Sequence, residues 1–175
     1  SGQRQMCIRD RTIYIVGIRS CAPLASFLAF YFHMIFPDVR QVQTNSSSEI
    51  FEQMIRITED DVVIGISFPR YSMRTMKALE FANSRKAKVI TITDSVHSPM
   101  NVYAACTLIA KSDMASIVDS LVAPLSVINA LVVALCMKRQ ADVKKTLESM
   151  EKLWDEYQVY SNDEINGLDL SLIHI

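Results

Sequence analysis

Residues 61–75 read DVVIGISFPRYSMRT and join an apolar run to hydroxyl groups that surround one arginine. The apolar part, residues 62–66, predicts a strand buried on both faces, and a helix is expected to begin at about Ser72. A helix N-terminus presents unpaired backbone N–H groups and the positive end of the helix dipole, which together favour an anion. The stretch therefore predicts a strand–loop–helix that binds phosphate.

The polar side chains of this stretch are the first candidates for ligand contacts. They are Ser67, Arg70, Tyr71, Ser72 and Thr75. Hydroxyl groups are neutral donors, and the arginine guanidinium is a forked donor with a permanent charge. The alternative is an ordinary helix N-cap beside a solvated arginine, which requires no ligand.

Runs with strand composition alternate with helical stretches along the chain. The strand candidates are residues 12–16, 39–43, 62–66, 88–92 and 106–110. The helix candidates are residues 23–34, 49–57, 72–84, 99–104, 114–138 and 142–157. Residues 39–43 alternate polar and apolar side chains, which places this strand at an edge. The alternation predicts a three-layer, doubly wound α/β fold with a five-stranded parallel sheet and right-handed crossovers.

The loops at the carboxyl ends of the strands are where such a fold binds ligands, next to the reversal of strand order. Further candidates in these loops are Arg19 and Ser20, then Ser46, Ser47, Ser48 and Glu49, and finally Asp94, Ser95 and His97. Ser46 and Glu49 also form a capping-box pattern, which explains the second loop without a ligand. Asp94 is typical of a turn cap and His97 has no identifiable partner, so neither is assigned to catalysis.

The composition indicates one globular domain. The chain has 175 residues, 50% of them hydrophobic, and a formal net charge of −1, which argue against disorder and against a basic nucleic-acid-binding surface. The widely spaced cysteines predict buried, reduced thiols: Cys7, Cys21, Cys106 and Cys136. The histidines are scattered and only four glycines occur, so we expect neither a metal site nor a dinucleotide cofactor.

Two apolar segments lie in the C-terminal third of the chain. Residues 121–137 are nearly long enough to cross a membrane, but Pro124 and Asn129 interrupt them, so we expect a helix buried in the core or in a subunit interface. No cleavable signal is visible, and we expect a cytoplasmic protein. The last helix candidate carries an apolar stripe, which predicts core packing or a dimer seam: Val143, Leu147, Met150, Trp154 and Tyr157.

Five segments carry a specific family resemblance: IYIVGIRSCAPLA, SSSEIFEQ, ISFPRYSMRTMKAL, VITITDSVHSP and AKSDMASIVDSLVAPLSVINAL. On these segments the chain resembles the SIS (sugar isomerase) domain over residues 12–157, and most closely the effector domain of RpiR/MurR-type transcription regulators. The resemblance implies a flavodoxin-like SIS fold, a sugar phosphate ligand and a homodimer. The N-terminal helix-turn-helix domain of these regulators is absent here, so DNA is expected only through a separate domain.

The two ends of the chain have no place in this pattern. We interpret residues 1–11 and 167–175 as a tag scar or other non-native sequence.

The resemblance assigns ligand contacts to Ser20 in the first loop and to Ser47 and Ser48 in the second. In the third loop the usual pattern is Ser-x-Ser-Gly-x-Thr, and Ser67 and Ser72 match its first and last positions. Because this match agrees with the local chemistry of the third loop, the phosphate site is favoured over the plain N-cap there.

Two residues of the third loop depart from the family pattern. Pro69 replaces the second serine and Arg70 replaces the glycine. Glycine lets a backbone approach phosphate closely, whereas arginine cannot but can pair with it through two N–H groups. The ligand is therefore held differently, or is an acid sugar, or the pocket is altered.

Three functions remain open on this sequence. The leading hypothesis is a phosphosugar-sensing effector and dimerisation domain, in which the ligand biases two arrangements of a homodimer. Its predicted contacts are Ser20, Ser47, Ser48, Ser67, Arg70, Ser72 and Thr75, with Arg19, Tyr71 and Glu49 as further candidates. An aldose–ketose isomerase or lyase would need an acid and a base, for which only His97 and Glu49 are available, so no enzyme is expected. The third is a dimerisation module with a non-binding pocket.

Overall fold

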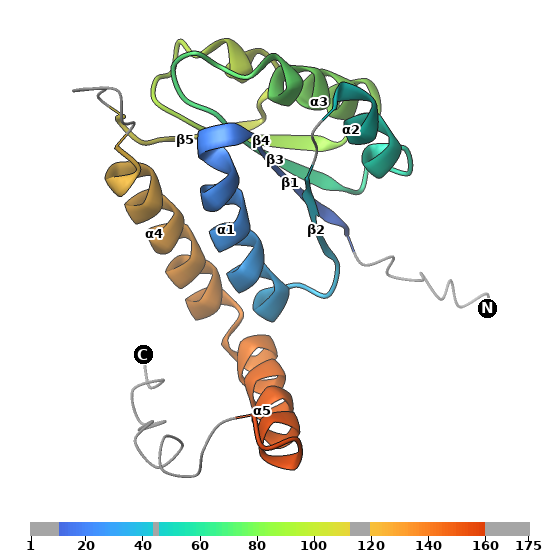
Figure 1. Cartoon of the computed structure of the whole chain (residues 1–175), viewed down its shortest axis with the longest axis vertical. Coiled ribbons are helices and arrows are strands. Elements are labelled where there is room, and N and C mark those ends of the chain that lie inside the picture. The colour runs from blue at the N-terminus through green and yellow to red at the C-terminus, as the bar shows by residue number, and fades with distance from the viewer. Residues whose placement is uncertain (1–10, 44–45, 113–119, 160–175) are drawn as a thin grey trace, which may run out of the picture.

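A five-stranded parallel sheet lies between two layers of helices in the computed structural model, which describes residues 11–43, 46–112 and 120–159 (Figure 1). The strands are β1 (Ile13–Gly17), β2 (Val39–Val42), β3 (Val62–Ile66), β4 (Lys88–Thr93) and β5 (Cys106–Ile109). Their order is β2-β1-β3-β4-β5, and every neighbouring pair is parallel. The predicted fold class is confirmed, and β2 lies at an edge as expected.

The helices divide between the two faces of the sheet. On one face lie α1 (Ala22–Ile35), which the 3₁₀ turn η1 (Arg19–Cys21) precedes, and α4 (Val122–Lys138). On the other face lie α2 (Ser47–Met54), α3 (Met73–Ser84) and the 3₁₀ helix η2 (Pro99–Tyr103). The last helix, α5 (Gln140–Glu156), follows α4.

The hydrophobic core has two halves because successive strand side chains point to opposite faces. In β1, Ile13 and Ile15 pack with α1 and α4, whereas Tyr14 and Val16 pack with α2 and α3. All five residues of β1 are buried. The strands at the centre of the sheet are thus covered on both faces, as their continuous apolar runs predict.

Helix α4 differs from its prediction in two ways. It begins at Val122 rather than at residue 114, and residues 113–119 lie outside the described part of the chain. Burial in the core holds for one face only, since Pro124, Ile128 and Val132 are buried whereas Val122 is 74% exposed, and the alternative of a subunit interface stays a prediction. The buried residues of α4 pack in the core cluster that includes α1, whereas Val122, Val133 and Met137 are each more than half exposed.

Helix α5 projects beyond the sheet (Figure 1), and none of its residues is buried. Its apolar stripe is at most half-buried, and Tyr157 just after the helix is 72% exposed. Only the start of the stripe packs on the core, through the half-buried Val143, so core packing accounts for little of it and the dimer seam stays a prediction. Among residues 11–43, 46–112 and 120–159, no single helix is long and apolar enough to cross a membrane, and α4 and α5 meet that criterion only as a pair bent by 97°.

Smaller differences concern a helix end and the thiols. The helix expected over residues 49–57 begins at Ser47 and ends at Met54. Cys21 is buried as predicted, but Cys136 is half-buried and Cys106 is exposed because β5 is an edge strand. The expectations for Cys7 and for both chain ends lie outside the described residues.

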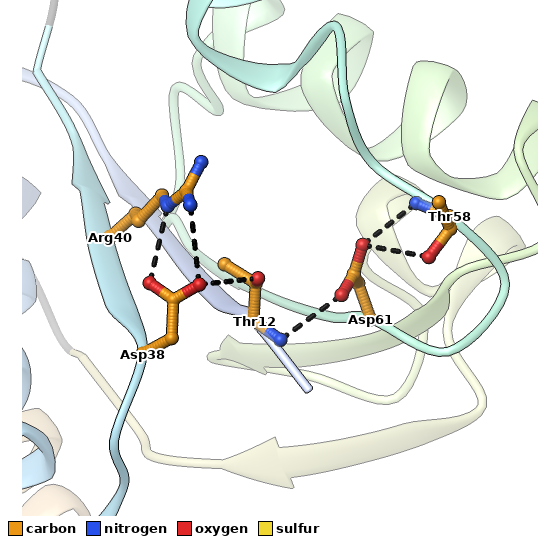
Figure 2. A network of polar contacts seen from close by, with 5 residues as sticks. All are labelled: Thr12, Asp38, Arg40, Thr58 and Asp61. Carbon is orange, nitrogen blue, oxygen red and sulfur yellow. Dashed lines mark hydrogen bonds and ion pairs between the residues drawn. The ribbon is translucent and has the colours of Figure 1, made fainter. Parts of the chain in front are cut away.

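Two aspartates tie together the amino ends of β1, β2 and β3 (Figure 2). The buried carboxylate of Asp61 accepts hydrogen bonds from the N–H of Thr12 (3.0 Å) and from the N–H and hydroxyl of Thr58 (2.8 and 3.0 Å). Asp38 accepts a hydrogen bond from the Thr12 hydroxyl (2.7 Å) and pairs with Arg40 (3.2 Å). These contacts order the sheet at the end opposite to the predicted ligand loops.

Candidate functional site

A pocket of about 560 Å³ opens at the carboxyl ends of β1 and β3. Residues 18–21, which follow β1, and residues 67–74, which follow β3, line it. β2 and β3 lie on opposite sides of β1, so the strand order reverses between β1 and β3. The pocket therefore occupies the topological switch point, where open α/β sheets bind their ligands.

The wall after β1 depends on Gly17. A Cβ atom on this residue would lie 2.6 Å from the carbonyl oxygen of Cys21 and 2.9 Å from the Cβ of Ala25. The absence of a side chain lets the η1 turn fold back onto the end of β1, where the N–H of Cys21 donates to the carbonyl of Ile18 (3.3 Å). This turn places Arg19 and Ser20 on the pocket wall.

The wall after β3 is a hydroxyl-rich turn into α3. The hydroxyl of Ser67, a buried residue, accepts a hydrogen bond from the N–H of Ser72 (3.1 Å). Ser72 is the N-cap of α3, and its hydroxyl accepts from the N–H of Thr75 (3.4 Å). Ser72 is therefore an N-cap, as the alternative interpretation predicts. This role does not exclude a ligand, because the hydroxyls of Ser67 and Ser72 accept these hydrogen bonds and can still donate their own O–H.

Thr75 lies on the first turn of α3 and does not line the pocket. Thr75 is fully buried, and its Oγ1 has no hydrogen-bond partner within the described part of the chain. A buried polar atom without a partner costs roughly 1–3 kcal/mol, so such atoms are rare in native proteins. Thr75 Oγ1 is thus an unsatisfied polar atom next to the N-terminus that is predicted to hold an anion.

Two of the pocket arginines have a backbone conformation that glycine prefers. Arg19 has φ 58° and Arg70 has φ 66°. The glycine that the family pattern has at the position of Arg70 is explained by this left-handed conformation, which glycine adopts without steric penalty. Arg70 adopts it as well, so its side chain is presented at the pocket in spite of the local strain.

The pocket is rich in positive charge. The third arginine, Arg74, lies on the first turn of α3 and is half-buried. Among the described residues that line the pocket there are three arginines and no aspartate or glutamate. Arg74 was not among the sequence-based candidates, although its place two residues after the N-cap Ser72 was a signal that could have identified it.

Tyr71 joins the pocket to the loop after β4. Its hydroxyl donates a hydrogen bond to the carboxylate of Asp94 (2.8 Å), which also accepts from the hydroxyl of Thr93 (3.1 Å). Burial raises the pKa of the Tyr71 hydroxyl above its ordinary value, and the bond to Asp94 raises it further. Tyr71 therefore stays a neutral donor to Asp94, and its hydroxyl proton is already engaged there.

The described side chains of the second loop are not part of the pocket lining. Neither Ser48 nor Glu49 lines it. The hydroxyl of Ser46 accepts from the N–H of Glu49 (3.4 Å) and lies 3.1 Å from the hydroxyl of Ser48, which fits the capping interpretation of this segment. Ser47 is the first residue of α2, and its side chain lies outside what the structure describes.

The loop after β4 also remains apart from the pocket lining. His97 is exposed, and its N–H donates to the hydroxyl of Ser95 (3.1 Å). Within residues 11–43, 46–112 and 120–159, no group of three or more His, Cys, Asp or Glu residues is placed to hold a metal ion.

The comparison with family models identifies the chain. The sequence model of the SIS domain matches residues 6–134. The chain belongs to the SIS domain family. No curated protein matches the sequence at a significant level.

Solved structures share the fold of this SIS domain. The sugar isomerase domain of the RpiR transcription factor from Sphaerobacter thermophilus has a TM-score of 0.77 and 23% identity, over 82% of this chain and 80% of that chain. The Vibrio vulnificus NanR protein complexed with ManNAc-6P has a TM-score of 0.73 and 16% identity, over 87% of this chain but only 58% of NanR. A hypothetical protein from Methanococcus jannaschii, whose structure infers the function of a 3-hexulose-6-phosphate isomerase, has a TM-score of 0.60 and 14% identity, over 79% of this chain and 78% of that chain.

Proposed function

We propose that this SIS domain binds a phosphorylated sugar and serves as the phosphosugar-sensing and dimerisation domain of an RpiR-type transcription regulator. The observation that carries the proposal is the pocket at the switch point, where a helix N-terminus, three serines and three arginines line one space. The similar structures support it, since one is a domain of the RpiR transcription factor and another is a complex with ManNAc-6P. A regulator of this kind would act on DNA in the cytoplasm through a separate domain.

The phosphate would bind at the N-terminus of α3. There the first-turn N–H groups and the helix dipole favour an anion, and the hydroxyls of Ser67 and Ser72 can donate to its oxygens. Arg70 would pair with the phosphate through two N–H groups, and Ser20 would contact the phosphate or a sugar hydroxyl. Thr75 would pack beneath this first turn of α3 without touching the phosphate, because its Oγ1 is fully buried.

An isomerase is the second candidate function, because that activity is inferred for the similar protein from Methanococcus jannaschii. The positions of the titratable residues favour binding over catalysis. An isomerase or lyase requires a base and an acid within hydrogen-bond reach of the sugar. Glu49 and His97, the only candidates for these roles in the sequence, do not line the pocket.

The exposed apolar faces of α4 and α5 support a homodimer. On α4, Val122, Val133 and Met137 are each more than half exposed. On α5, Leu153 is 53% exposed, and the stripe of Leu147 and Trp154 has no buried member. Contiguous apolar surface of this kind is typical of interaction sites, and a second copy of the same helices would cover it.

Thermal unfolding with a panel of ligands tests the binding proposal. The panel contains glucose 6-phosphate, ManNAc-6P and ribose 5-phosphate, with glucose and inorganic phosphate as controls. A ligand at about a hundred times its Kd adds roughly 2.7 kcal/mol of stability, which raises Tm by several degrees.

Ser67→Ala should remove most of this increase in Tm, measured against the Tm of the variant without ligand. Ser84→Ala, at the opposite end of α3, is the matched control and should retain it. The absence of an increase with every sugar phosphate would favour the module with a non-binding pocket.

A further inference from the structure

We infer that helix α5 of one copy of this chain docks into an apolar groove on a second copy, so that the two chains of the homodimer exchange their last helices reciprocally. The inference deepens the homodimer of the proposed function and rests on that part of it. It concerns a face of the molecule that the ligand pocket does not use.

The groove has a volume of about 520 Å³ and lies at the amino ends of the strands. Residues of β1, β3, β4 and β5 line it together with the carboxyl ends of α1 and α4. It is therefore separate from the ligand pocket, which opens at the carboxyl ends of the strands.

The sheet beneath the groove is incompletely covered. Val62 on β3, Ile90 on β4 and Leu108 on β5 pack against the core cluster under α1 and α4 but are only half-buried. β3 and β4 are internal strands of this parallel sheet. Such strands are normally covered on both faces, and native proteins contain few voids larger than a water molecule. The groove thus lacks one covering element.

The α5 helix of the same copy does not supply this cover. Arg139 lines the groove and directly precedes α5, which begins at Gln140. No described residue of α5 is part of the lining, because the helix is bent by 97° from α4 and projects beyond the sheet (Figure 1). α5 therefore starts beside the groove and leads away from it.

The apolar side of α5 identifies the occupant. It consists of Leu147, Met150, Leu153 and Trp154, and Tyr157 continues it just after the helix. None of the α5 residues is buried, although an apolar stripe of this kind is normally packed against another element. The groove and the stripe belong to one chain and adjoin at Arg139. A twofold axis near this residue would fill both grooves with the two stripes at once, as an isologous dimer requires.

The available area suits a stable dimer. A standard interface buries about 1,600 Å² in total, and reciprocal exchange divides this among two stripes and two grooves, about 400 Å² each. A fully covered aromatic side chain buries roughly 150–250 Å², so Tyr157, which is 72% exposed, can supply roughly 100–180 Å². Leu153 and Val159 are each more than half exposed and supply further area.

The charges of the two surfaces are compatible. Residues 147–156 of α5 carry a net charge of −3, from Glu148, Glu151, Asp155 and Glu156 against Lys152. Among the described residues that line the groove there is no aspartate or glutamate. Its charged residues are Arg11, which is exposed, and Arg139, which pairs with Asp142 at the start of its own α5. The acidic half of the partner's helix therefore meets no like charge.

Cross-linking between Cys106 and cysteines introduced on α5 tests the inference. Cys106 is exposed and lines the groove. In the full chain with Cys7→Ser and Cys136→Ser, one stripe residue at a time is replaced: Leu147→Cys, Met150→Cys or Leu153→Cys. A short bismaleimide should then join two chains into a covalent dimer on a denaturing gel. Its rate should exceed that of the chain with Cys106 alone by at least about tenfold, because docking raises the effective concentration of the two thiols.

Three matched variants carry the thiol on the exposed, opposite face of α5: Lys145→Cys, Glu148→Cys and Lys152→Cys. They should form covalent dimer no faster than the chain with Cys106 alone. Cys106→Ser should abolish cross-linking of the stripe variants. All these substitutions lie at residues that are not buried, so the variants should fold, which far-UV circular dichroism checks.

Every other outcome overturns the reciprocal docking. A stripe cross-link that survives Cys106→Ser would mean that the two α5 helices pack on each other. A cross-link within one chain would mean that the groove takes its own α5. No cross-link in a protein that light scattering shows to be dimeric would assign the groove to another occupant and keep the homodimer. A monomeric protein would overturn the homodimer as well. Phosphosugar binding is tested separately by thermal unfolding and stands or falls on that result.

Discussion

Substitution of Arg70 should change the stability of the fold and the affinity for a ligand in opposite directions. Its left-handed conformation costs a non-glycine residue roughly 1–2 kcal/mol, whereas glycine loses up to about 1 kcal/mol through its larger freedom in the unfolded chain. Arg70→Gly should therefore raise the free energy of unfolding by about 0.5–1 kcal/mol, measured by urea denaturation. The same substitution should weaken binding of a sugar phosphate about tenfold, because the charged pairing is lost.

Lys86 is the matched control for Arg70. It has φ 61° just after α3, where the N–H of Lys86 donates to Asn83 (2.9 Å) and that of Ala87 to Ala82 (3.1 Å), the pattern of a Schellman cap. Lys86→Gly should stabilise the fold by a similar amount and leave ligand affinity unchanged. Destabilisation by Arg70→Gly, with stabilisation by Lys86→Gly, would show that the Arg70 side chain supports the fold.

Asp61 is the residue on which the amino ends of the strands depend. Its carboxylate, in a residue only 2% exposed, accepts from the N–H groups of both Thr12 and Thr58. Asp61→Ala leaves those donors without their partner, so we expect a loss of about 2–4 kcal/mol in urea denaturation. Asp60→Ala, at the exposed neighbouring residue, should change stability by less than about 0.5 kcal/mol. Equal effects of the two substitutions would contradict the importance of the network.

Asp38 gives this end of the sheet a pH dependence. The hydrogen bond from the Thr12 hydroxyl, and then the interaction with Arg40, hold the pKa of Asp38 below its ordinary value of 3.8. The ionised carboxylate is therefore favoured by folding, so its stabilising effect is complete above about pH 5 and is lost as pH falls through 3.8 and below. The effect should be only about 0.5 kcal/mol because the pair is partly exposed. Asp38→Asn should reduce the loss of stability between pH 5 and pH 3, and an unchanged pH profile would contradict the prediction.

At the scale of elements, the contact between β1 and α1 sets the shape of the pocket. A methyl group on Gly17 would meet the backbone carbonyl of Cys21, whereas one on Gly65 would meet only the side chain of Leu79 (2.8 Å), which can move. Gly17→Ala should therefore lower the free energy of unfolding by about 2 kcal/mol and weaken sugar phosphate binding, because η1 is displaced. Gly65→Ala should cost less and preserve binding. Thermal unfolding with and without the ligand measures both, and the reverse order would contradict this account of the wall.

The elements themselves follow local patterns closely. The apolar run at residues 62–66 became β3 with the same bounds, and Ser72 became the N-cap of α3. Both depend on chemistry within a few residues, namely side-chain apolarity and a hydroxyl that can reach the first turn. Helix α4 begins at Val122, whereas the sequence-based boundary was residue 114, and residues 113–119 lie outside the described part of the chain.

At the scale of the whole molecule, the unburied stripe of α5 predicts an effect on assembly. Leu147→Asp should shift the protein towards a monomer, because a charge in an apolar interface is costly to bury. Size-exclusion chromatography with light scattering measures the shift. Glu148→Gln, on the exposed face of the same helix, is the control and should leave the mass unchanged. A monomeric parent protein at micromolar concentration would contradict the proposed homodimer.

The sequence by itself determined the α/β class, the edge position of β2, the helix N-terminus at Ser72 and the family to which the chain belongs. These features depend on periodicity, capping residues and motifs that are local in the chain. Only the tertiary structure decided that Arg74 joins the pocket formed by residues 18–21 and 67–74 and that Ser48 and Glu49 lie outside it. It also decided that Tyr71 donates to Asp94, and that α4 and α5 expose apolar faces. The physical reason is that these features arise from contacts between residues far apart in the chain, which local spacing does not encode.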